Sequence, residues 1–131
     1  MRVKQVILIR RDLKMRRGKE IAQGSHASCD FLVSALRQHL RQSGESDPTI
    51  QLTSAEKYWI IHGMAKVCLQ VGSEEELLEV HETAVEAGLK SHLIRDSGRT
   101  EFGGVPTLTA LAIGPDEAVK IDQVTGDLKL Y

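Results

Sequence analysis

Near its N-terminus the chain reads VILIRRDLKMRRGK over residues 6–19, a short apolar run followed by a strongly cationic segment. The apolar part predicts a buried strand over residues 3–9, because short β-branched runs are typical of strands covered on both faces. Residues 10–19 contain six arginines or lysines, Lys14, Arg16 and Arg17 among them, and lead into a helix. Backbone N–H groups, a favourable helix dipole and fixed cations therefore meet at one place. The combination favours an anionic ligand, and so many cations favour a polyphosphate.

The segment from Lys19 to about Arg41 has helical periodicity. At about 100° per residue, a polar stripe (Lys19, Gln23, His26, Asp30) borders an apolar stripe. We predict that the apolar stripe is buried, and it consists of Ala22, Cys29, Val33, Leu36 and Leu40. A helix of this kind holds site residues at the rim of a cleft while its apolar side anchors it. Cys29, in the middle of the apolar stripe, is expected to be inert packing rather than a nucleophile.

The remaining elements follow from capping and turn signals. Two capping-box patterns, Thr53 with Glu56 and Ser73 with Glu76, each open a helix. Glycines at positions 63 and 88 end these helices. The full prediction is a loop at 43–48, a helix from 53 to about 61, a strand at 66–71, a helix from 73 to about 87, strands at 92–94 and 107–113, and a short final helix that begins at Pro115.

This order, β, α, α, β, α, β, β, α, predicts one α/β domain over residues 1–131. Strands separated by helices can be parallel, whereas the last two strands are joined by about a dozen residues without helical pattern, so the four-stranded sheet is mixed. Helices are expected on both faces of this sheet. A hydrophobic content of 41% and a charged content of 27% are ordinary for a globular domain.

Charge is unevenly distributed along the chain. The formal net charge is −1, yet residues 1–41 hold 10 basic and 3 acidic residues, residues 42–92 hold 3 and 9, and residues 93–131 hold 4 and 6. If the fold keeps these blocks apart, one face is basic enough to attract a polyanion. The alternative is that the charges interleave on folding.

Two cysteines in apolar surroundings and the lack of a signal-peptide pattern predict a reduced, cytoplasmic protein. No apolar run approaches the roughly 20 residues of a membrane span, so no membrane association is expected. His26, Cys29, His62 and Cys68 lack paired ligand spacings, and we predict no metal site. Trp59 is expected to pack on the sheet or on a partner subunit rather than to stack on a base.

A second group of polar residues, Arg95 to Thr100, follows the predicted third strand. Ligands in open α/β sheets bind outside the carboxyl ends of strands, which is also where the cationic segment lies, so the two groups can share one cleft. Arg95 and Arg99 can bind phosphate, Asp96 is a candidate base or acceptor, and a turn at Gly98 would expose the Thr100 hydroxyl. The alternative for Asp96 is an Asx-turn that only caps the loop.

Motifs across nearly the whole chain resemble the archaeal and eukaryotic type of peptidyl-tRNA hydrolase. The matching residues are Asp12–Met15, Gly18-Lys19, Ala22-Gln23, His26-Ala27, Leu93–Thr100, Ile113–Pro115, Val124–Gly126 and Leu128–Leu130. The resemblance implies a compact α/β domain with a four-stranded mixed sheet, commonly dimeric, that needs no cofactor. The implied activity is hydrolysis of the ester between a peptide and the terminal ribose of tRNA.

Carried over by position, the family's functional lysine corresponds to Lys19, its aspartate to Asp96, and its two threonines to Thr100 and Thr109. Gln23 and His26 correspond to a glutamine and a histidine on the first helix, where either substrate contact or a hydrogen bond to the backbone is open. The loop at 101–106 is about one residue longer than in the family. Two other functions remain alternatives. One is a non-catalytic RNA-binding module. The other is a phosphohydrolase, although the chain lacks the phosphate-loop motif that such an enzyme would be expected to contain.

Overall fold

The computed structural model describes residues 1–44 and 47–131, so residues 45 and 46 of the predicted loop lie outside the described part. The predicted element order is confirmed, with two short 3-10 helices in addition. The elements are β1 (Val3–Arg10), η1 (Arg11–Leu13), α1 (Arg17–Ser43), α2 (Ser54–Ile61), β2 (Lys66–Val71), α3 (Glu74–Glu86), β3 (Ser91–Asp96), η2 (Phe102–Gly104), β4 (Thr107–Glu117) and α4 (Ala118–Thr125).

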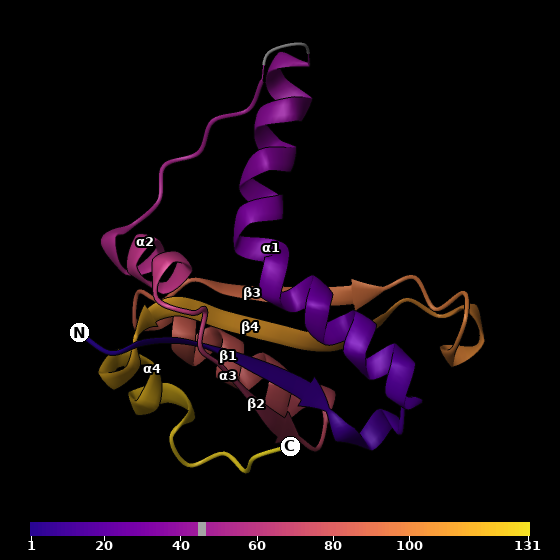
Figure 1. Cartoon of the computed structure of the whole chain (residues 1–131). Coiled ribbons are helices and arrows are strands. Elements are labelled where there is room, and N and C mark those ends of the chain that lie inside the picture. Colours follow the sequence, from indigo (N-terminus) through magenta and orange to yellow (C-terminus); the bar gives the residue numbers. More distant parts are fainter. Residues whose placement is uncertain (45–46) are drawn as a thin grey trace.

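The four strands form one mixed sheet in the order β2-β1-β4-β3 (Figure 1). β1 and β2 are parallel, and β4 runs antiparallel to both β1 and β3. The first three strands therefore point the same way, and their carboxyl ends lie at one end of the sheet. α1 also begins at that end, because η1 follows β1 directly.

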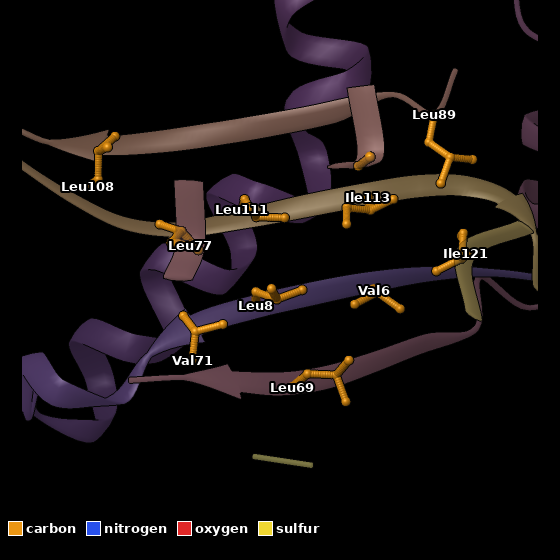
Figure 2. Close-up of a cluster of buried hydrophobic side chains, with 11 residues drawn as sticks. Val6, Leu8, Leu69, Val71, Leu77, Leu89, Leu108, Leu111, Ile113 and Ile121 are labelled. Atoms are coloured by element: carbon orange, nitrogen blue, oxygen red, sulfur yellow. The ribbon is translucent and has the colours of Figure 1, made fainter. Parts of the chain in front are cut away.

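Helices cover both faces of the sheet, as predicted. On one face, Val6, Leu8, Leu111 and Ile113 pack against Leu77 of α3 and against α4 (Figure 2). On the other face, Ile7, Ile9, Ala110 and Ala112 pack against Ala27 of α1, with Met15 closing the cluster. The small alanines of β4 let α1 lie close to the sheet, which places its first turns beside the end of β3.

The predicted buried stripe of α1 is wrong. The buried residues of α1 are Gln23, Ala27 and Phe31, whereas Ala22, Cys29, Val33 and Leu40 are exposed and Leu36 is half-buried. The reason is visible in Figure 1, where the second half of α1 extends past β3 and beyond the sheet. A helix that leaves the sheet has no surface there on which to bury Val33, Leu36 or Leu40. Over the sheet, α1 turns Gln23 and Ala27 towards the strands instead of Ala22 and Cys29. α1 is also too polar to span a membrane, and no other helix of the described residues qualifies.

α2 opens with the predicted capping box: the Thr53 hydroxyl accepts from the Glu56 N–H, and the Glu56 carboxylate accepts from the Thr53 N–H. Trp59 is 4% exposed, and its ring meets Phe31 edge-on with the ring centroids 5.8 Å apart. Its indole N–H donates to the Ala65 carbonyl at 2.8 Å. The prediction that Trp59 packs rather than stacks on a base is confirmed, and this packing fixes α2 against α1.

The predicted start of the last helix at Pro115 is wrong, because β4 continues to Glu117 and α4 begins at Ala118. Val3 and Lys4 of β1 pair with Glu117 and Asp116, so the sheet offers partners that the local pattern does not reveal. Pro115 lies where the register between β1 and β4 shifts, a position at which a residue without an N–H costs the ladder little.

Candidate active site

The candidate site lies where α1 begins and β3 ends. The Lys19 ammonium, on the first turn of α1, donates to Asp96 Oδ1 at 2.9 Å and to Thr100 Oγ1 at 2.8 Å. The side chains of Lys19 and Asp96 are 15% and 12% exposed. Two segments 77 residues apart in the chain are thus joined, as the strand order predicts. The ammonium remains at the surface of the cluster, where a ligand can reach it.

The Asp96 carboxylate accepts hydrogen bonds from several donors. Besides Lys19, the Gly98 N–H donates to Oδ2 at 2.9 Å and the Gln23 amide donates to Oδ1 at 3.4 Å. The hydrogen bond from Lys19 is the largest cause that lowers the Asp96 pKa below 3.8, and the Gly98 N–H and the charge of His26 act in the same direction against burial. The Asx-turn and the Lys19 contact therefore coexist, one on each carboxylate oxygen.

Gly98 determines the path of the loop that carries Thr100. Its φ is +81°, and a Cβ placed there would lie 2.2 Å from the Val105 carbonyl oxygen. Only glycine fits both the backbone conformation and this close approach. The tight turn directs the chain back so that the exposed Thr100 hydroxyl reaches Lys19, as the sequence predicts.

Gln23 and Thr109 form a buried connection behind Asp96. The Thr109 side chain is fully buried, and its hydroxyl donates to Gln23 Oε1 at 2.5 Å. Gln23 is 3% exposed, and its amide NH₂ donates a hydrogen bond to the Asp96 carboxylate. Its partners are side chains, so the alternative of a hydrogen bond from Gln23 to the helix backbone is absent from its described contacts. The pair fixes the orientation of the carboxylate from β4.

Replacing Thr109 by valine should lower the free energy of unfolding by about 1–3 kcal/mol, because the buried Gln23 carbonyl loses its donor without a change of shape. Chemical denaturation measures the effect. Thr107→Val is the matched control on the same strand, since the Thr107 hydroxyl donates to Val105 in an exposed position; a surface change of that kind costs about 0.5 kcal/mol or less. Equal losses in both variants would contradict the assignment.

The predicted cations surround the start of α1 and the loop after β3, and all five are exposed: Lys14, Arg16, Arg17, Arg95 and Arg99. Arg16 pairs with Glu101 of the loop, with Nε 3.0 Å from Oε1. Within residues 1–44 and 47–131, Lys14 and Arg17 form no ion pair. Their charges are therefore available to an anionic ligand.

Comparison with known proteins gives the family. A model of the family described as Peptidyl-tRNA hydrolase PTH2 matches residues 3–131. The chain belongs to the peptidyl-tRNA hydrolase family. The peptidyl-tRNA hydrolase of Methanothermobacter thermautotrophicus is 40% identical over 128 residues, which cover 98% of this chain and 99% of the relative. That of Aeropyrum pernix is 43% identical over 129 residues, covering 98% and 95%. The resemblance recognised from the sequence motifs is confirmed.

A groove of about 820 Å³ begins at Gln23 and Asp96 and continues along α1. His26 and Arg95 line it, as their predicted role in binding requires. Sequence reasoning did not single out Ser34 and Arg37, which also line the groove, and placed Asp30 only on the polar stripe of the helix. Their spacing continues the polar stripe of Lys19, Gln23 and His26 at helical intervals, and that periodicity is the signal that could have found them.

Cys29 and Cys68 are exposed, so the prediction that both lie in apolar interior positions is wrong. They line an apolar groove between α1 and the uncovered β2 side of the sheet. In the part of the chain that the structure describes, no three histidine, cysteine or acidic side chains are grouped as metal ligands.

Proposed function

We propose that this chain hydrolyses the ester bond that joins the peptide to the terminal ribose of tRNA in peptidyl-tRNA, which recycles the tRNA. The observation that carries the proposal is the Lys19 ammonium, held by Asp96 and Thr100 beside a cationic surface. Membership of the peptidyl-tRNA hydrolase family supports the same activity. The reaction needs an oriented water and a positive group near the carbonyl oxygen, and both fit this position.

In the proposed reaction, the oxygen of a water attacks the ester carbonyl carbon and the negative charge develops on the carbonyl oxygen. The Lys19 ammonium stabilises this oxyanion. The bond to the ribose oxygen then breaks and the peptide leaves as a carboxylate. The ribose oxygen takes one proton of the attacking water, and the other proton passes to the solvent. An ester is more reactive than an amide, so positioning and charge stabilisation suffice without a covalent intermediate.

Asp96 and Thr100 have different roles in this scheme. A carboxylate whose pKa lies below its ordinary value is a weak base near neutral pH. We therefore propose that Asp96 orients the Lys19 ammonium and does not act as the general base. Thr100 accepts from Lys19 and can donate its own hydroxyl proton to the water or to the ribose. Gln23 and Thr109 are positioning residues, because both are buried behind the carboxylate.

The tRNA is proposed to bind across the start of α1. Lys14, Arg16 and Arg17 lie there, and the N-terminus of a 27-residue helix adds N–H groups without a side-chain cap. Arg95 and Arg99 flank Asp96 on the other side of Lys19 and are proposed to bind the terminal phosphates. This arrangement brings the 3′ end of the tRNA to the Lys19 ammonium.

The purified chain should release peptide from N-acetyl-alanyl-tRNA, and the double variant Lys14→Gln, Arg17→Gln should raise KM by about 10-fold at 0.15 M salt. The slope of log KM on log salt should fall by about 1.4, or about 0.7 for each lost contact to a single strand. Lys57→Gln is the control, because Lys57 is exposed on α2 at the opposite end of the sheet (Figure 1). Salt-sensitive tRNA binding without any peptide release would instead indicate a binding module.

On the family resemblance we also propose a homodimer that needs no cofactor. A cytoplasmic location is proposed from the two free cysteines. Sedimentation of the purified chain tests the homodimer, and a sedimentation coefficient of a monomer at micromolar concentration would exclude it. Cell fractionation tests the location.

A further inference from the structure

β3 forms one edge of the sheet and has a free side (Figure 1). On its paired side, the Gly114 N–H donates to the Lys90 carbonyl just before β3 begins. Bonded residues alternate in an antiparallel pair, so the bonding continues at His92 and Ile94. The N–H and C=O of Leu93 therefore point out of the sheet. Among the described residues, no main-chain hydrogen bond from another segment reaches these two groups.

The groove described above runs along this edge. Residues 93–97 form its floor and α1 forms its wall from residue 22 to residue 37. At one end Asp96 and Gln23 belong both to the groove and to the Lys19 cluster, and Arg37 lies at the other end. Residues 22 and 37 are 15 helical rises apart, a span of about 22 Å. That length accommodates about six residues of an extended peptide.

We infer that this groove binds the C-terminal residues of the peptide part of the substrate, which add to the edge of β3 as a short extra strand. The inference rests on the proposed function, because that function places the ester carbonyl at Lys19. The peptide then leaves Lys19 towards Leu93, and its N-to-C direction is parallel to that of β3. Its main chain pairs with the outward N–H and C=O of β3.

Main-chain pairing suits a substrate whose sequence varies. Hydrogen bonds to backbone groups are the same for every peptide, whereas side-chain pockets select particular residues. The groove has apolar residues such as Val33 and Ile94 beside polar ones, so it tolerates side chains of both kinds. A hydrolase that recycles tRNA from unfinished chains meets all sequences at this position.

One fixed carboxylate, that of Asp30, argues for peptide rather than RNA in the part of the groove beside His92. Asp30 lies on its wall, held by the Ser34 hydroxyl at 2.8 Å and by His92 Nδ1 at 3.0 Å. A fixed carboxylate repels phosphates, whereas a peptide main chain offers N–H donors to it. Lys14 and Arg17, at the start of α1, do not line the groove. Arg95 lines its end beside Asp96, where the terminal phosphates are proposed to bind, and Arg37 lies at the other end. The peptide part is therefore placed beyond Arg95, away from the start of α1.

The substrate side of the inference can be tested with the intact protein. N-acetyl-tetra-alanyl-tRNA should have a KM about 10-fold lower than N-acetyl-alanyl-tRNA, which reflects about two added hydrogen bonds. In the longer substrate, alternate N–H groups of the peptide should face β3. Of two adjacent peptide amide nitrogens, methylation of one should therefore raise KM about 3- to 10-fold, and methylation of the other should change KM less than twofold. Equal KM values for the two chain lengths, or equal effects of both methylations, would overturn the inference.

A variant of the groove completes the test. Val33→Trp, on the exposed wall, should abolish the 10-fold KM advantage of the longer substrate, whereas Leu40→Trp, on the same helix beyond the groove, should retain it. If Val33→Trp instead weakens inhibition by uncharged tRNA to the same extent, the groove binds RNA and the inference fails. If neither substrate is hydrolysed by the unmodified protein, the proposed function itself fails.

Discussion

Lys19→Ala should lower kcat for the hydrolysis of N-acetyl-alanyl-tRNA by about 10²- to 10³-fold, the usual cost of losing one donor to a developing oxyanion. The ammonium is the cation that Asp96 and Thr100 hold in place, so its removal leaves the site without a fixed positive charge at that point. Folding should persist, because Asp96 keeps the Gly98 N–H and the Gln23 amide as donors. Circular dichroism and thermal unfolding check this.

Lys19→Arg is the conservative control for this prediction. Part of the activity should return because Lys19→Arg keeps the positive charge. The recovery should be incomplete because a planar guanidinium cannot place one nitrogen between Asp96 and Thr100 as the ammonium does. The separation of kcat from KM is informative here. If Lys19→Ala changed only KM, Lys19 would only bind phosphate. A Lys19→Ala variant with more than a third of the original kcat would contradict the proposed role of Lys19.

Much of the fold could be predicted because local signals agree with the tertiary structure. The Thr53 capping box, the strand at 66–71 and the glycine stops all depend on residues within five positions of one another. Pro115 was misassigned because its partner strand is more than 100 residues away in sequence. Strand pairing of that range leaves no local trace.

The apolar stripe of α1 shows a different limit. Periodicity identifies a helix with an apolar side but does not reveal whether a sheet lies beneath it. Ala27 is buried because close packing on Ala110 and Ala112 favours a small residue, and Gln23 is buried because it has polar partners inside. Phe31 packs separately, against Val3 and Trp59. A buried glutamine reads as a surface residue in any pattern of polar and apolar types.

The meeting of Lys19 and Asp96 was predictable from topology, since both follow strands that end at the same end of the sheet. The groove beyond them was not, because it depends on β3 being an edge strand and on the path of α1 past it. Strand order is a global property, and no residue of β3 signals that its neighbour is missing.

Asp96→Asn should reduce kcat about 10²-fold while the protein still folds, because the ammonium loses the anion that orients it. The amide keeps the size of the carboxylate, but its single oxygen can accept from Lys19 or from Gly98, not from both in the original geometry. Its NH₂ group then faces the remaining donor. Asp122→Asn is a matched control, since Asp122 pairs with Lys4 at an exposed site.

The pH dependence of stability gives this prediction an independent check. Asp96 has a pKa below 3.8 in the folded chain, chiefly because Lys19 donates to it, so its carboxylate binds protons less readily folded than unfolded. The resulting stabilisation is present above the unfolded pKa and is lost as the pH falls through the lowered folded pKa. The difference in unfolding free energy between the unmodified protein and Asp96→Asn should therefore be constant above about pH 5 and should shrink below about pH 4. A difference that instead grew on acidification would mean that the carboxyl is protonated in the folded protein, and Asp96 could then not hold the Lys19 ammonium in place.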